Sequence, residues 1–303
     1  MSNFKTWISA LRLRTLPLSV SGIIIGTCLA AYNGFFDGTT FVLAILATVA
    51  LQILSNLAND YGDGVKGTDN KDRIGPVRAI QSGNISPHEM LNAIRINILI
   101  IILVVFFLIL NAFGIQNFVY SLIFFALGII SIYAAIKYTI GTSAYGYRAL
   151  GDLMVFLFFG CLTVMGSYFL YTRQLDHILI LPAFSIGLLS AGVLNLNNMR
   201  DIESDKKSNK ITMAVIMGLY NAKIYHALLI ITAIVLSVLF GILYYRTLLN
   251  FIFVIAFIPL VIHVSKVLKT KEAVNLDSQL KILALSTFLF SVLLGVGYVY
   301  NFI

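Results

Sequence analysis

Nine long apolar runs dominate this chain and determine most of what it can fold into. Each run holds about 20 residues with few charges, which is the length that an α-helix needs to cross the hydrocarbon core of a bilayer. The runs cover residues 15–33, 41–60, 94–113, 118–138, 150–171, 178–198, 222–244, 247–268 and 282–302. The strict apolar–polar alternation that marks a membrane β-barrel is absent from them. The sequence therefore predicts an all-α polytopic membrane protein with nine transmembrane helices.

The composition excludes several other classes of protein. Of the 303 residues, 59% are hydrophobic and only 11% are charged, whereas a soluble domain carries about 25% charged residues. A soluble enzyme, a secreted disulfide scaffold and a disordered chain are therefore ruled out. The net charge of +8 does not indicate a nucleic-acid partner, because the basic residues follow the connections between the apolar runs. The partner that this pattern predicts is the lipid bilayer.

The distribution of basic residues also predicts the orientation in the membrane. Of the 21 Lys and Arg residues, all but Arg173 and Arg246 lie in the N-terminal segment or at the connections that follow even-numbered runs. Cytoplasmic connections carry the excess of Lys and Arg in membrane proteins. We therefore expect the N-terminus in the cytoplasm, the C-terminus outside, and residues 1–303 to form a single transmembrane domain.

Two polar segments at the predicted cytoplasmic helix ends share one pattern. Residues 56–83 read NLANDYGDGVKGTDNKDRIGPVRAIQSG, and residues 195–210 read NLNNMRDIESDKKSNK. Asn59 and Asp63 are four residues apart, as are Asn197 and Asp201, so each pair lies on one helical face. The two pairs are separated by four predicted helices. This spacing predicts an internal four-helix repeat.

These segments carry the residue types of a magnesium and diphosphate site. Acidic side chains near a bilayer are costly unless a cation neutralises them, and carboxylate and amide oxygens suit Mg²⁺, which also accepts substrate phosphates. The candidate metal ligands are Asn59, Asp63, Asp69, Asn197, Asp201 and Asp205. All of these except Asp69, together with Asp60, are the candidate catalytic residues. The basic residues that are candidates for binding phosphate oxygens are Lys66, Arg73, Arg78, Lys206 and Lys210.

These segments have two other interpretations. A single cluster of this kind is typical of a solvated cytoplasmic loop, but two clusters with the same spacing and location favour a binding site. A cation-coupled transporter also uses carboxylates on membrane helices. It places them near the middle of the bilayer, often at broken helices, whereas both sets here lie at helix ends. An enzyme is therefore the preferred hypothesis.

The two segments resemble the Asp-rich motifs of the UbiA-type intramembrane aromatic prenyltransferases. The stretch NDYGDGVKGTDNKDRIGPVRAIQSG is most similar to the menaquinone-pathway branch, and RLRTLPLSVSGIIIG (12–26) and YTIGTSAYGYRALGD (138–152) agree with it. The first motif of the superfamily often has a third acidic residue where this chain has Gly67, and Asp69 is the candidate substitute.

The resemblance implies both a fold and a reaction. The fold is nine helices around a central cavity, with a cytoplasmic cap formed by 61–93 and 199–222. The reaction is Mg²⁺-dependent transfer of a polyprenyl group from polyprenyl diphosphate to 1,4-dihydroxy-2-naphthoate, with decarboxylation, giving demethylmenaquinone in a bacterial plasma membrane. Transfer to 4-hydroxybenzoate is the alternative, because the same metal clusters serve both acceptors.

Several further residues are candidates for binding substrates. Tyr133 and Lys137 form a YxxxK pair on one helical face, similar to a superfamily element near the diphosphate. The candidates for acceptor contact in the following connection are Tyr138, Tyr147, Arg148 and Asp152, with Arg148 as the carboxylate partner. Arg12 and Arg14 are weaker candidates for orienting an acidic substrate. The 22 Phe and 15 Tyr residues supply electron-rich walls that shield an allylic cation from water.

Overall fold

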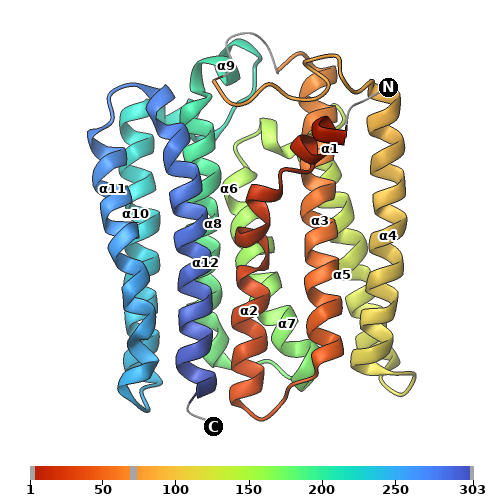
Figure 1. Ribbon diagram of the computed structural model, residues 1–303, viewed down its shortest axis with the longest axis vertical. Helices are drawn as coiled ribbons and strands as arrows, with labels where there is room; N and C mark the ends of the chain where they lie inside the picture. The colour runs from red at the N-terminus through yellow and green to blue at the C-terminus, as the bar shows by residue number, and fades with distance from the viewer. Residues whose placement is uncertain (1–3, 69–73, 301–303) are drawn as a thin grey trace.

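The structure, a computed structural model, describes residues 4–68 and 74–300 of the chain. Over these residues, nine helical spans are long and apolar enough to cross a membrane, which confirms the predicted all-helical architecture (Figure 1). The α-helices are α1 (Phe4–Leu11), α2 (Leu16–Tyr32), α3 (Gly38–Val65), α4 (Pro87–Phe113), α5 (Phe118–Lys137), α6 (Gly151–Val155), α7 (Thr163–Thr172), α8 (Ile180–Arg200), α9 (Ile202–Lys207), α10 (Met213–Leu243), α11 (Phe257–Lys269) and α12 (Asp277–Val299). Short 3₁₀ segments lie at Leu13–Thr15, Tyr145–Tyr147, His177–Leu179, Leu248–Ala256 and Ala273–Leu276.

Capping residues define where several spans begin and end. Asp37 precedes α3 and accepts a hydrogen bond from the Thr40 backbone N–H at 2.6 Å. Ser86 and Glu89 form a reciprocal capping box at the start of α4, and such a box satisfies two backbone N–H groups of the first turn. Gly114 ends α4 with a φ of +61°, a backbone conformation that glycine adopts without a steric penalty.

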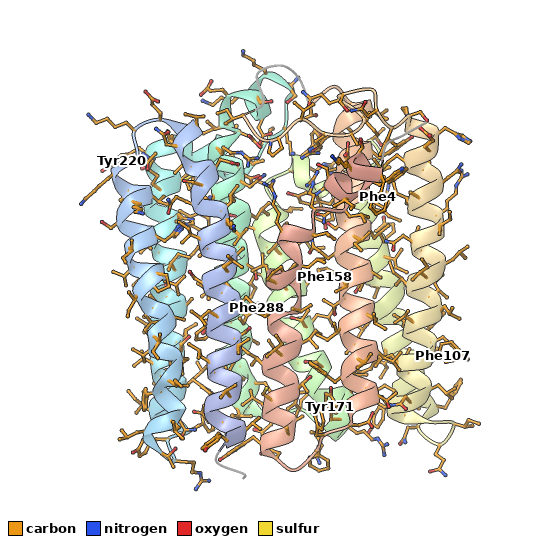
Figure 2. All side chains as sticks on the ribbon, in the orientation of Figure 1. Phe4, Phe107, Phe158, Tyr171, Tyr220 and Phe288 are labelled. Carbon is orange, nitrogen blue, oxygen red and sulfur yellow. The ribbon has the colours of Figure 1, made fainter. Side chains whose placement is uncertain are left out.

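The outer surface of the bundle is apolar. Leu99 on α4 is 66% exposed, and Phe107 on the same helix points outward in Figure 2. Along the whole length of α5, Ala134 is the one residue that is buried. Large apolar side chains on an outward face are costly in water but are favourable against lipid tails. The exposed faces of α4 and α5 are therefore lipid-facing surfaces.

Two large apolar clusters, and a smaller third one that includes Leu196, Met199 and Leu276, hold the bundle together. Of the two large clusters, one joins α2, α7, α8 and α10–α12, and the other centres on α3 and α4. Between α6 and α7 the chain forms a π-helix, Phe156–Leu162. Within it, a Cβ on Gly160 would lie 2.5 Å from the Ala183 carbonyl oxygen of α8. In α2, a Cβ on Gly26 would lie 2.3 Å from the Val164 carbonyl oxygen of α7. Glycine is therefore required where the fifth span meets α8 and α2.

The polar connections gather at one end of the bundle. Figure 1 shows α1, α9 and the segments between α3 and α4 at this end, while the C-terminus lies at the opposite end. The helices extend into the segments that were predicted to form the cap. The helix α3 ends at Val65, and α10 begins at Met213 with a non-helical break at Gly218. The backbone N–H of Ala149, in the connection between α5 and α6, donates to the Ile211 carbonyl at 2.8 Å and so joins this connection to the 199–222 segment.

Candidate active site

A central cavity of about 600 Å³ opens among the spans, within the range of small-molecule sites. The helices α2, α3, α5, α6, α8 and α12 and the π-helix contribute to its wall. Its inner part is lined by apolar side chains, including Leu18, Leu51, Phe158 and Phe159, and Figure 2 shows Phe158 in the middle of the bundle. Polar side chains line the end that faces the cap. The cavity therefore suits a ligand with an apolar tail and a charged head.

The first acidic motif is held by basic residues from two other segments. The Asp63 carboxylate is buried and accepts hydrogen bonds from Arg78 Nη1 at 2.9 Å and from Lys210 Nζ at 3.3 Å. Its other oxygen accepts from the Tyr147 hydroxyl at 2.8 Å. Arg78 Nη1 also donates to the Asn59 carbonyl oxygen at 2.9 Å. The chain thus brings a carboxylate, two cations and a phenol together at one end of the cavity.

The second acidic motif is organised by Arg200, the largest fully buried side chain described. Its guanidinium binds both carboxylate oxygens of Asp201, at 2.9 and 2.6 Å. It also donates to Asn197 Oδ1 at 2.9 Å and to Asp277 Oδ1 at 2.6 Å. A buried arginine needs such a complete set of acceptors. Arg200 therefore joins the end of α8 to the first residue of α12.

The charges of the cap are coupled to one another. Burial opposes the charge on Lys210, but the Asp63 and Asp205 carboxylates outweigh it and raise the pKa of this lysine. Burial raises the pKa of the Asp205 carboxyl to about 6, with Lys210 acting in the opposite direction. Burial also raises the pKa of the Tyr147 phenol, and the Asp63 carboxylate adds to this effect. At neutral pH the site therefore holds a charged lysine beside a neutral phenol.

The oxygen donors of the two motifs fit a magnesium ion. Asn59 Oδ1 is buried and has no hydrogen-bond partner among the described residues, and Asn59, Asp63 and Asn197 all line the central cavity. A carboxylate with amide oxygens and room for phosphate is the donor set that Mg²⁺ takes in proteins. In the first motif Arg78 Nη1 donates to the Asn59 backbone carbonyl and to Asp63 Oδ2, and in the second Arg200 Nη2 donates to Asn197 Oδ1 and to Asp201 Oδ2.

The structure brings most of the predicted site residues to the cavity or its rim. Those that line the cavity are Asn59, Asp63, Arg78, Tyr138, Asn197 and Lys210. Two other predicted residues lie next to this set. Lys66 Nζ is 4.1 Å from the centre of the Tyr147 ring, and Asp205 Oδ1 is 3.9 Å from Lys210 Nζ. Asp201 is linked to Asn197 of the cavity wall through Arg200, which donates to both side chains. Asp60 instead accepts the backbone N–H groups of Ala79 and Ile80, which positions the segment that carries Arg78.

Other predicted residues do not line the cavity. Tyr133 is 61% exposed on the outer face of α5, with Lys137 Nζ 6.0 Å from its ring centre. Arg148 is exposed, and so is Lys206, which pairs with Glu203 at 3.5 Å. Asp152 is buried at the start of α6, beside the cavity wall. Asp69 and Arg73 fall outside the described residues.

Several cavity residues were missed by the sequence analysis. Gln52 and Asn56 line the wall one to two turns before Asn59, and their spacing on the face of α3 that carries Asn59 and Asp63 was a signal that could have identified them. Asp277 and Lys281 of α12 also line the cavity, but neither belongs to a motif. Arg12 and Arg14, the weaker candidates, both lie in its wall.

Tyr147→Phe tests the hydrogen bond to Asp63. The variant loses a donor to a buried carboxylate, a contact worth about 1.5–3 kcal/mol, so we expect kcat to fall by roughly tenfold or more. Tyr145→Phe is the matched control, because the Tyr145 hydroxyl donates to the Ala134 carbonyl rather than to an acidic motif. Steady-state turnover by the two purified variants is the measurement, and equal rates would contradict the assignment.

Comparison with known proteins identifies the family. Residues 19–292 match the UbiA prenyltransferase family. The chain belongs to this family. Among its UbiA relatives, 1,4-dihydroxy-2-naphthoate octaprenyltransferase of Escherichia coli is 46% identical over 257 residues, covering 84% of this chain and 82% of the relative. The enzyme of the same name from Haemophilus influenzae is 39% identical over 295 residues, covering 97% and 95%.

Solved UbiA structures share the fold. A UbiA homologue from Aeropyrum pernix matches with a TM-score of 0.70 at 16% identity, over 96% of this chain and 99% of the other. A UbiA homologue from Archaeoglobus fulgidus, bound to GPP and Mg²⁺, matches with a TM-score of 0.69 at 15% identity, over 97% and 99%. The resemblance found in the sequence motifs is therefore confirmed, and membership of a prenyltransferase family favours the enzyme over the cation-coupled transporter.

Proposed function

We propose that this chain transfers a polyprenyl group from polyprenyl diphosphate to 1,4-dihydroxy-2-naphthoate with loss of carbon dioxide, giving demethylmenaquinone. The observation that carries this proposal is the convergence of Asn59, Asp63 and Asn197 on the polar end of an otherwise apolar cavity. The names of the two bacterial relatives support the acceptor. The GPP and Mg²⁺ bound by the Archaeoglobus homologue support the donor and the metal.

The cap residues hold the diphosphate. Arg78 and Lys210 line the cavity beside Asp63, and a guanidinium has five N–H donors. Arg78 therefore keeps its bond to Asp63 while it donates to phosphate oxygens. Asn59, Asp63, Asn197, Asp201 and Asp205 would hold Mg²⁺, which when bound neutralises the leaving diphosphate. Asp69 remains a further candidate ligand.

The apolar part of the cavity protects the reacting carbon. Departure of the diphosphate leaves an allylic cation, which water would destroy. Phe158, Phe159 and Tyr138 place aromatic rings in the wall, and aromatic faces stabilise a nearby cation while excluding water. The electron-rich naphthoate ring attacks this cation, and loss of its carboxylate as carbon dioxide restores aromaticity. A strong general base is therefore unnecessary.

Arg12 and Arg14 are the better candidates for the acceptor carboxylate. Both line the central cavity, whereas the exposed Arg148 does not. Arginine binds carboxylates in a bidentate geometry. We therefore assign orientation of the acceptor to the segment that joins α1 to α2.

The excess of basic residues at the capped end supports a cytoplasmic location for that end and its acidic motifs in a bacterial cell. The N-terminus then lies in the cytoplasm and the C-terminus outside.

Parallel acceptor assays test the proposed function. The purified full chain in detergent receives Mg²⁺, a labelled polyprenyl diphosphate and either 1,4-dihydroxy-2-naphthoate or 4-hydroxybenzoate. We expect a prenylated naphthoquinol and carbon dioxide, with turnover lost in EDTA and restored by excess Mg²⁺, because the acidic motifs need a divalent cation to bind diphosphate. Prenylated hydroxybenzoate without carbon dioxide would overturn the acceptor. Undiminished turnover in EDTA would overturn the metal.

A further inference from the structure

A second, smaller pocket lies beside the central cavity at the capped end of the bundle. Its volume is about 280 Å³. One wall comes from α1 and the turn after it, including Ser9 and Leu13, and the opposite wall comes from Pro76, Val77 and Ala79 of the segment between α3 and α4. Ser9 and Val77 are exposed, so the pocket opens on the outer surface of the capped end. Figure 1 shows α1 at this end of the molecule.

The outer pocket and the central cavity share one polar wall. Arg12, Arg14, Arg78 and Asn197 line both the outer pocket and the central cavity. Arg12 has a left-handed backbone with a φ of +48°, an uncommon conformation for a residue with a side chain. This turn links α1 to the short helix before α2, at the boundary between the two hollows. The boundary is therefore built from charged and amide groups rather than from apolar side chains.

The charge of the shared wall favours anions. Among the described residues, three arginines and one carboxylate line the outer pocket, and this carboxylate, Asp60, accepts the backbone N–H groups of Ala79 and Ile80 at 3.2 and 3.4 Å. A concave surface on which one sign of charge predominates raises the local concentration of oppositely charged ligands. Inorganic diphosphate and an aromatic carboxylate are both small, water-soluble anions that this wall would attract.

We propose that the outer pocket is a water-side port that binds small anions on their way into or out of the central cavity, either the aromatic carboxylate or the released inorganic diphosphate. The proposal rests on the proposed prenyl transfer. A prenyl tail fills the apolar part of the cavity, and a free diphosphate cannot leave through hydrocarbon because burying its charge is prohibitive. The arginine wall provides a polar route instead.

Covalent modification of Ser9→Cys tests the port after the chain has folded. Ser9 lines the pocket but carries no role in the acidic motifs. The full chain is treated with methanethiosulfonate reagents of similar size that attach either a sulfonate or a trimethylammonium group. Thr6→Cys on the same helix, outside the pocket lining, is the matched control. Wild-type chain treated in the same way accounts for Cys28 and Cys161.

Three quantities separate the possible outcomes: kcat/KM for the acceptor, the inhibition constant of inorganic diphosphate, and kcat/KM for polyprenyl diphosphate. We expect the sulfonate on Cys at position 9 to worsen either of the first two by about tenfold or more, and the trimethylammonium group to do so much less. A change in the acceptor value identifies entry, and a change in diphosphate inhibition identifies exit. The value for polyprenyl diphosphate should stay within about twofold, because its tail reaches the cavity from the bilayer.

The port would be overturned if the two reagents had equal effects or if Thr6→Cys responded as strongly as Ser9→Cys. A parallel loss of kcat/KM for polyprenyl diphosphate would also overturn it. Binding of inorganic diphosphate, measured by calorimetry without turnover, keeps this test separate from the proposed function. If the unmodified wild-type chain binds diphosphate but forms no prenylated product, the proposed function fails. The port is still tested in that case, by whether the sulfonate at position 9 weakens diphosphate binding.

Discussion

Asp63→Asn is expected to abolish prenyl transfer, with a fall in kcat of about a thousandfold or more. Asp63 is the one carboxylate in the cavity wall that contacts Arg78, Lys210 and Tyr147 together. The amide has no negative charge to hold a divalent cation or to align the two basic residues with the diphosphate. Initial rates of label transfer at saturating substrates are the measurement.

The same change also affects stability, so folding must be measured alongside activity. Two buried cations lose their shared counter-ion, and breaking a buried ion pair costs about 3–5 kcal/mol. Thermal unfolding followed by intrinsic fluorescence in detergent separates an inactive folded variant from an unfolded one. Asp37→Asn is the matched control, since Asp37 caps α3 at the opposite end of the bundle and asparagine is an equally good cap. A folded Asp63→Asn variant with a tenth of wild-type activity would contradict the assignment.

Arg200→Met is expected to lose both stability and transfer. The substitution leaves Asp201 buried without its guanidinium partner, and it frees Asn197 and Asp277 from their shared donor. We expect about 3–5 kcal/mol of destabilisation, seen as a lower unfolding temperature. Arg200→Lys should recover little, because an ammonium cannot reproduce the bidentate bond to Asp201.

A double variant shows whether Arg200 acts through Asp277. In Arg200→Met with Asp277→Asn, the second change removes a carboxylate that has already lost its guanidinium partner, so it should cost less than it does in the wild-type background. Arg173→Met is the control for loss of an arginine, since Arg173 lies at the opposite end and donates to the Ala112 carbonyl. Additive effects of the two changes would show that the contact between α8 and α12 carries no coupling energy.

The spans and the acidic motifs could be predicted because they are local properties of the sequence. A run of about 20 apolar residues needs no tertiary information to be identified as a span, and the four-residue spacing of Asn59 and Asp63 places both on one face of a helix. Span boundaries were less accurate. The structure starts α10 at Met213, well before the predicted 222, because Thr212 caps a short helical segment that precedes the break at Gly218.

Contacts between distant segments could not be predicted. Arg200 meets Asp277 across 77 residues, and His226 meets His263 across 37, with their Nε2 atoms 2.8 Å apart. Neither pair has a spacing that marks it in the sequence, because helix rotation and packing set which side chains face one another. Packing also decides that Arg148 is exposed and does not line the cavity, which its position between two spans did not reveal.

The π-helix at Phe156–Leu162 sets the rotational phase of the fifth span. An α-helix advances by about 100° for each residue, and a π-turn holds one residue more than the α-turn it replaces. Removing one residue from this stretch would therefore turn the rest of the span, Thr163–Thr172, by about 100° relative to α6. Thr163 and Ser167 would leave their positions against Gly22 and Gly26, while Met154 and Val155 kept theirs at the cavity wall. The length of this short stretch thus sets the angular offset between the half of the span that forms the cavity and the half that packs against α2.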